Sequence, residues 1–121
     1  MYGKRYGKRA DMIVHRQEPF NAETCLAALA EGPLTATDAF YVRSHAPVPQ
    51  IDPAAWRLRV DGLVERELEL SLATLREALP EREKTATLQC AGNRRKGLMA
   101  IRDIPRQEPW GGGATGRGRK R

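Results

Sequence analysis

Residues 87–95, with the sequence TLQCAGNRR, bring together side chains that are able to do chemistry. The β-favouring run that starts at Lys84 predicts a strand ending at Cys90, so the thiol would stand where a strand feeds a loop. Positive charge beside a thiol stabilises the thiolate, which is the form that binds metals. The arginines that follow offer a planar fork of donors that fits oxyanions. The segment therefore predicts a soft-metal ligand beside an anion pocket.

The same spacing also fits a structural interpretation. Cys90 would then be a buried residue at a strand end, with Arg94 and Arg95 as solvated surface charges. Cys25 is interpreted as a packing residue on a helix. Because the sequence has no CxxC or Cys/His cluster, neither a zinc site nor a disulfide between the two cysteines of a cytosolic chain is expected.

Short elements must position these residues. The Ala and Leu spacing of residues 23–31 predicts a short helix that Gly32 and Pro33 end. Residues 39–45 (AFYVRSH) favour an extended stretch, and the Pro-rich residues 46–53 predict a rigid loop.

The middle of the chain alternates apolar and polar residues. Residues 56–61 (WRLRVD) predict a half-buried strand with one apolar face, and residues 67–70 predict a second strand. Ser71 is placed to cap a helix that Pro80 closes. Its leucines 72, 75 and 79 would share one face.

Composition and charge restrict the class of protein. Of the 121 residues, 40% are hydrophobic and 30% charged, which is typical of a soluble globular domain. The net charge of +6 comes from the ends, because residues 1–16 and 111–121 each carry +4 and residues 17–110 carry −2. With no nucleic-acid motif, the basic ends predict at most non-specific binding of phosphates. No secretory signal, twin-arginine motif or membrane-spanning run is seen, so a cytoplasmic location without membrane contact is expected.

Two motifs resemble those of a known family. TLQCAGNRR is similar to the signature of the sulfite oxidase family, and FYVRSHAPVP (residues 40–49) resembles a second motif that usually has Asn in place of Ser44. Arg43 and Cys90 lie 47 positions apart, which also suits the family. The resemblance runs from about residue 6 to residue 114 and is strongest to bacterial members without haem.

The resemblance implies a molybdenum–molybdopterin cofactor and a role for each matching residue. Cys90 would ligate molybdenum as a thiolate, and Arg43 and Arg95 would face an oxyanion substrate. Trp110 would form a wall of that pocket. The residues alone also fit other interpretations, with Arg43 as a surface residue and Trp110 as a core aromatic. The loop expected to hold the pterin consists of Tyr41, Val42, Arg43, Ser44 and His45, of which His45 also fits a purely structural role.

The function implied is oxygen-atom transfer to or from a small oxyanion such as sulfite, by a molybdopterin-dependent enzyme that passes electrons to an external acceptor such as a cytochrome. No haem segment is expected in this chain. Alternatives are a family member acting on nitrate or another oxidised substrate such as oxidised methionine, a truncated inactive fragment, or a binding module with a basic tail. Many members of the family are dimeric, so the resemblance also implies a homodimer for the full-length enzyme.

The expected fold is α+β, a sulfite oxidase-like molybdopterin-binding fold that is incomplete, with short strands in a mixed sheet, one or two helices and long loops. Residues 1–16 are interpreted as a basic arm, 17–114 as the N-terminal part of the oxidoreductase domain, and 115–121 as a basic tail that diverges from the family near Gly113. A truncated or frameshifted gene would produce such an end. The isolated chain is therefore expected to be poorly stable and inactive.

Overall fold

The computed structural model describes residues 6–120, and what was predicted for residues 1–5 and 121 lies outside this range. Contacts between residues divide the chain into two units. The first unit contains residues 6–48 and 84–120, and the second contains residues 49–83. Both predicted motifs fall almost entirely within the first unit.

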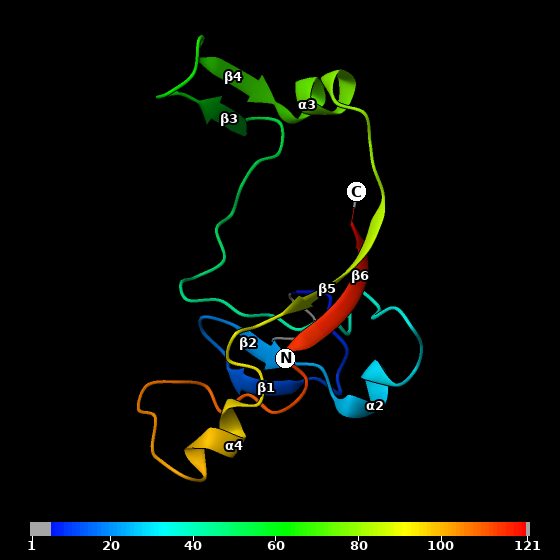
Figure 1. The fold of residues 1–121 in the computed structure, drawn as a ribbon, viewed down its shortest axis with the longest axis vertical. Helices are drawn as coiled ribbons and strands as arrows, with labels where there is room; N and C mark the ends of the chain where they lie inside the picture. Colours follow the sequence, from blue (N-terminus) through cyan, green and yellow to red (C-terminus); the bar gives the residue numbers. More distant parts are fainter. Residues whose placement is uncertain (1–5, 121) are drawn as a thin grey trace. The chain divides into compact units, whose positions relative to one another are not determined.

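A hairpin opens the first unit. Strand β1 (Ile13–Arg16) pairs antiparallel with β2 (Asn21–Glu23), and the register shifts between Val14 and Arg16 (Figure 1). Residues 1–16 were predicted as a basic arm, and in the described part residues 13–16 are extended and pair with β2. Met12, which precedes β1, and Phe20, which follows it, pack in one apolar cluster.

That cluster is the small apolar core of the first unit. Phe20 and Ala22 are fully buried, and Met12 is nearly so. Tyr6 stacks on Phe20 with ring centroids 4.9 Å apart, and Val42 packs against the same group. Burial of these side chains fixes β2, whose three residues are all buried, in the centre of the unit.

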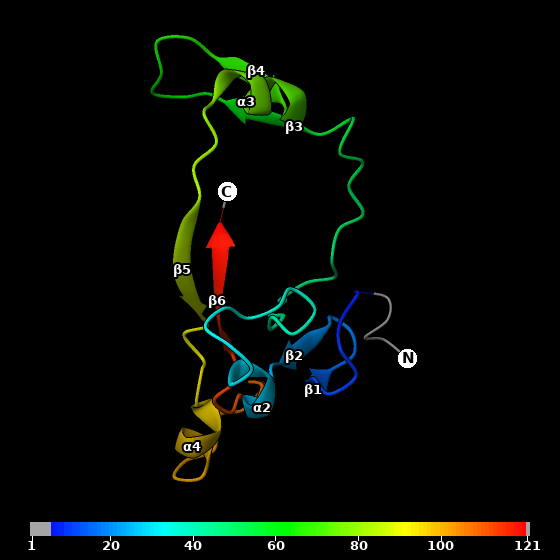
Figure 2. The same ribbon diagram turned by 90° about the vertical axis from the view of Figure 1, so that its right-hand side faces the viewer.

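Strands β5 (Lys84–Gln89) and β6 (Thr115–Lys120) form a second antiparallel pair, with Gln89 opposite Thr115 (Figures 1 and 2). Strand β5 was predicted, and its end before Cys90 is confirmed. Strand β6 was not predicted, because its glycines and arginines disfavour strands. A Cβ atom on Gly116 would lie 2.6 Å from the ring of Phe40, so glycine lets that ring approach the backbone of β6.

Two short helices complete the first unit. Helix α2 (Leu26–Leu29) confirms the helix predicted within residues 23–31, although it is shorter. Helix α4 (Arg95–Met99) follows Arg94, which has a left-handed backbone with φ of 65°. The sequence did not predict α4, because its single turn is too short for a periodic pattern.

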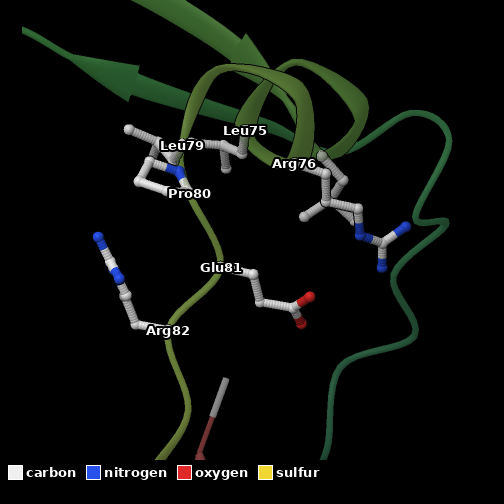
Figure 3. Close-up of a pocket in the computed structure, with 7 residues that line it drawn as sticks. Leu75, Arg76, Leu79, Pro80, Glu81 and Arg82 are labelled. Atoms are coloured by element: carbon white, nitrogen blue, oxygen red, sulfur yellow. The ribbon is translucent and has the colours of Figure 1, made fainter.

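The second unit consists of β3 (Arg57–Val60), β4 (Leu68–Ser71) and α3 (Leu72–Ala78), with β3 and β4 antiparallel. These elements confirm the two strands and the capped helix predicted for this region. The predicted half-buried apolar face is present in part, because Trp56 and Val60 are half-buried whereas Leu58 and Leu68 are each 37% exposed. A cavity of about 730 Å³ lies beside the end of α3, where Leu75, Leu79 and Pro80 lie near one another (Figure 3).

Ser71 caps α3, since its hydroxyl oxygen accepts a hydrogen bond of 3.0 Å from the N–H of Thr74. We expect Ser71→Ala to lower the free energy of unfolding of this unit by about 1 kcal/mol. Ser71→Asp retains an acceptor and should lose little. Urea unfolding followed by circular dichroism measures both, and equal losses in the two variants would contradict the capping role.

The described residues therefore form three two-stranded antiparallel sheets and three short helices, which agrees with an incomplete α+β arrangement. The predicted mixed sheet is not found among them, because every strand pair is antiparallel. Within residues 6–120, no helix has the length and apolar character needed to cross a membrane.

Candidate functional site

Cys90 lies at the turn that follows β5. Its thiol is partly exposed, and the sulfur accepts a hydrogen bond of 3.3 Å from the N–H of Gly92. The N–H of Asn93 donates to the carbonyl of Cys90 at 2.9 Å and closes the turn. The backbone of this turn therefore fixes the position of the sulfur beyond the end of β5.

Residues 110–114 (WGGGA), here called the glycine strap, run beside this turn. The N–H of Cys90 donates to the carbonyl of Ala114 at 2.9 Å, and that of Arg94 donates to the carbonyl of Gly111 at 2.6 Å. In return, the N–H of Ala114 donates to the side-chain oxygen of Asn93 at 3.0 Å. Hydrogen bonds therefore hold the Cys90 turn to the strap along its length.

Arg95 lies over the same turn. Gly92 is buried beneath its guanidinium, and a Cβ atom there would lie 2.5 Å from Nη2 of Arg95. Nη1 of Arg95 donates to the carbonyl of Glu108 at 3.2 Å. The structure thus brings Arg95 to the Cys90 segment, whereas Arg94 is exposed.

Arg43 lies in a loop that Asn21 organises. The buried amide of Asn21 accepts from the N–H of Ser44 and donates to its carbonyl, both at 2.9 Å. Nη1 of Arg43 donates to the same amide oxygen at 3.2 Å, and its Nη2 lies 3.1 Å from Nε2 of His45. Val42 joins the loop to β2 through a bridge with Ala22.

Asn21 was not predicted as a functional residue. The signal that could have found it is a polar side chain between two apolar residues, Phe20 and Ala22, in a segment short enough to bury all three. Its role is to keep the backbone of the predicted pterin loop in one conformation.

A small cavity of about 80 Å³ adjoins Arg43 and has a strongly basic lining. Arg16, Arg106 and Glu108 were not predicted as members of this site. The buried Glu108 pairs with Arg16 at 2.7 Å, and its carbonyl accepts from Arg95, so it links the two halves of the predicted anion pocket. The cationic excess suits an oxyanion. The lining residues are Arg16, Arg43, Ser44, His45, Arg106, Gln107 and Glu108.

Tyr41 lies near the thiol. Burial raises the pKa of its phenol, and the negative charge of the Cys90 thiolate raises that pKa further. The phenol therefore stays protonated at neutral pH. Tyr41 of the predicted pterin loop thus lies close enough to Cys90 for the charge of the thiol group to act on the phenol.

Trp110 is fully buried and meets the ring of His15 edge to face, with centroids 4.8 Å apart. In this structure it occupies the core position that the sequence left open as an alternative. Its role as a pocket wall stays a prediction.

The donor set fits a metal that an organic cofactor carries. Among residues 6–120, no group of three or more His, Cys, Asp and Glu side chains is placed to hold a metal. Cys90, with its partly exposed thiol, is a predicted site residue that could ligate a metal carried by an organic cofactor. A thiolate is a soft ligand of the kind that transition metals accept.

Comparison with known proteins identifies the family. Residues 45–119 match the sequence model of the oxidoreductase molybdopterin binding domain. The chain belongs to the sulfite oxidase family. The family match continues to residue 119, beyond the divergence predicted near Gly113. Strand β6 thus lies almost wholly within the matched region.

Three relatives show the extent of the similarity. The chain is 50% identical to the sulfite oxidase of Gallus gallus over 101 residues, which are 84% of this chain and 22% of that protein. It is 36% identical to the sulfite oxidase of Arabidopsis thaliana over 104 residues, 85% of the chain and 26% of the relative. It is also 46% identical to the NADPH nitrate reductase of Mycosarcoma maydis over 84 residues, 66% of the chain and 8% of the relative. The chain thus spans about a quarter or less of the length of these sulfite oxidase family relatives.

Proposed function

We propose that the protein to which this chain contributes is a molybdenum-dependent oxidoreductase that transfers an oxygen atom to or from a small oxyanion, with sulfite as the substrate. The observation that carries the proposal is the joining of the Cys90 turn and the basic cavity through Glu108. A soft ligand and an anion pocket in one region are what such a reaction needs. When bound, the molybdenum cofactor would supply the oxygen atom and accept two electrons.

The chain's own residues would bind and orient. Cys90 would hold the metal through its sulfur, which the hydrogen bond from the N–H of Gly92 orients. Arg43 and Arg95 would hold the oxyanion with paired donors. Tyr41, Val42, Ser44 and His45 would line the cofactor's binding loop, and Trp110 would shape the pocket from within the core.

The electrons would leave to an external acceptor such as a cytochrome. Sulfite-dependent reduction of cytochrome c or of a dye by the purified, molybdenum-loaded protein tests the proposal. Reduction with sulfite but not with a matched concentration of sulfate would support it. Molybdenum-loaded protein that shows no sulfite-dependent reduction would count against it.

Nitrate is the second candidate substrate, because the chain also resembles a nitrate reductase at 46% identity. Both substrates are oxyanions that a basic cavity would accept. Nitrate-dependent oxidation of a reduced dye by the same protein, faster than its turnover of sulfite, would favour this candidate.

Arg95→Lys should raise the KM for the oxyanion about 10- to 100-fold, because lysine keeps the charge but loses the paired donors. Arg94→Lys is the matched control, since Arg94 is the exposed neighbour, and it should leave the KM unchanged. Steady-state kinetics on molybdenum-normalised protein measure both. A similar KM change in the two variants would show that Arg95 has no specific part in substrate binding.

A further inference from the structure

A buried carboxylate in β2 has no role in the site described so far. Glu23 is 4% exposed, although ionised side chains are rarely buried without partners. Its partners lie almost ninety positions along the chain. Oε2 accepts hydrogen bonds from the N–H of Gly111 at 2.7 Å and from the N–H of Gly113 at 3.3 Å.

Glu23 therefore binds the glycine strap through two hydrogen bonds. The main chain of the next residue adds a third, because the N–H of Thr24 donates to the carbonyl of Gly113 at 3.1 Å. Hydrogen bonds that involve a charged acceptor are about twice as strong as neutral ones. Burial strengthens them again, since little water competes for the donors.

The glycines of the strap are needed for this approach. A Cβ atom on Gly111 would lie 2.8 Å from Oε1 of Glu23, and one on Gly113 would overlap the carbonyl oxygen of Thr24. Any larger residue would push the strap away from β2. The strap is thus built to lie against the carboxylate.

The strap is also bound to the Cys90 turn. Three backbone N–H groups of the turn, those of Cys90, Arg94 and Lys96, donate to carbonyls of the strap at 2.9, 2.6 and 2.9 Å. The strap is therefore hydrogen-bonded both to Glu23 and to the turn that carries the predicted metal ligand. A displacement of the strap would move the Cys90 turn with it.

We propose that Glu23 is a positioning residue that sets the place of the Cys90 thiol by holding the glycine strap. It acts through the strap and touches neither the thiol nor the oxyanion cavity. Its consequence for metal binding rests on the proposed function above. The effect of Glu23 on the position of the thiol does not rest on that function, and it can be measured without the cofactor.

The imidazole of His15 is a further neighbour of the carboxylate. Its Nε2 lies 3.5 Å from Oε1 of Glu23, and its side chain is 9% exposed. The hydrogen bonds from the strap end on Oε2, so His15 lies beside the other carboxylate oxygen, Oε1. A substitution that keeps an oxygen acceptor at position 23 should therefore preserve the strap even where it weakens the contact with His15.

The test measures the reaction of each cysteine with a thiol-alkylating reagent in cofactor-free protein, read by peptide mass spectrometry. Cys25 lies two positions from Glu23, and its Sγ contacts Asp11 rather than the strap, so it reports general opening of β2. The variants are Glu23→Ala and Glu23→Gln. The control is Glu31→Ala, which removes an exposed carboxylate paired with Arg9.

Glu23→Ala should raise the alkylation rate of Cys90 at least about tenfold, because loss of a hydrogen bond to a charged acceptor has an effect of that order. The rate at Cys25 should change by less than about twofold, within the scatter of surface substitutions. Glu23→Gln, which keeps an acceptor oxygen, should restore most of the protection of Cys90, and Glu31→Ala should change neither rate.

Equal acceleration at Cys25 and Cys90 would overturn the proposal, since it would mean general unfolding. No change at Cys90 would overturn it as well. In the molybdenum-loaded protein, Glu23→Ala should also shift the absorption of the thiolate–metal bond, whereas Glu31→Ala should not. If even the unsubstituted protein binds no molybdenum, the proposed function fails while the alkylation result still decides the role of Glu23.

Discussion

Cys90→Ser is expected to remove turnover almost completely. Serine keeps the size and the hydrogen bond from Gly92, but its hydroxyl stays protonated at neutral pH and is a hard donor. Loss of a group that only orients a metal ligand lowers affinity or activity about 10- to 100-fold, and loss of the ligand itself should exceed that range. Turnover per bound molybdenum, measured with sulfite and an excess of acceptor, gives the effect.

Cys25→Ser is the matched control for this prediction. Cys25 is the second partly exposed thiol of the chain, and it caps α2 through its backbone rather than its sulfur. Its replacement should leave turnover within about twofold of the unsubstituted protein, as for substitutions away from the site. Equal losses in the two variants would mean that the decline reflects damage to folding rather than loss of a ligand.

Gly113→Ala is expected to have the largest effect on stability. Its Cβ atom would overlap the carbonyl oxygen of Thr24, which belongs to the backbone and has no rotamer to adopt. Relief requires the strap to leave β2, with loss of the hydrogen bond between Thr24 and Gly113 and weakening of the contact with Glu23. Overpacking of this kind typically costs about 1–3 kcal/mol, and the backbone clash places Gly113→Ala at about 3 kcal/mol.

Gly97→Ala is the control for the addition of a methyl group. Gly97 lies in α4, and a Cβ atom there meets nothing within 4 Å. Alanine also favours helix over glycine by roughly 1 kcal/mol, so this variant should be as stable as the parent or more so. Urea unfolding of both variants measures the difference. Similar stabilities would contradict the close approach of the strap to β2.

Local elements were predictable from the sequence because their signals are local. The cap at Ser71, the stop at Pro80 and the strand that ends at Cys90 each depend on neighbours within a few positions. The fold class followed from the same signals at the level of short strands and helices. The prediction of a mixed sheet was wrong for the described residues, since strand pairing depends on contacts between residues distant in the sequence.

The candidate site was predictable only in part. Cys90 and Arg95 stood out because thiols and guanidinium groups have recognisable chemistry, and Arg43 stood out because its segment resembles a family motif. Glu23 and Glu108 did not, because a carboxylate acquires its role from partners that the chain brings to it: a strap 88 positions away for one, and Arg16 for the other. No periodicity or spacing in the sequence marks such long-range contacts.

Strand β6 also could not be predicted from its local sequence. Its sequence TGRGRK has poor strand propensity, and the two glycines suggested an irregular tail. Pairing with β5 along six residues and the close approach of Phe40 to Gly116 override that propensity. Tertiary contacts, rather than local preference, decide the structure there.

X-ray absorption spectroscopy at the molybdenum edge tests the central claim most directly. Comparison of the molybdenum-loaded protein with Cys90→Ser should show the loss of one metal–sulfur contact, because the sulfur of Cys90 would supply that contact. Cys25→Ser should leave the number of sulfur ligands unchanged. An unchanged number of sulfur ligands in Cys90→Ser, with molybdenum still bound, would contradict the assignment of Cys90 as the metal ligand.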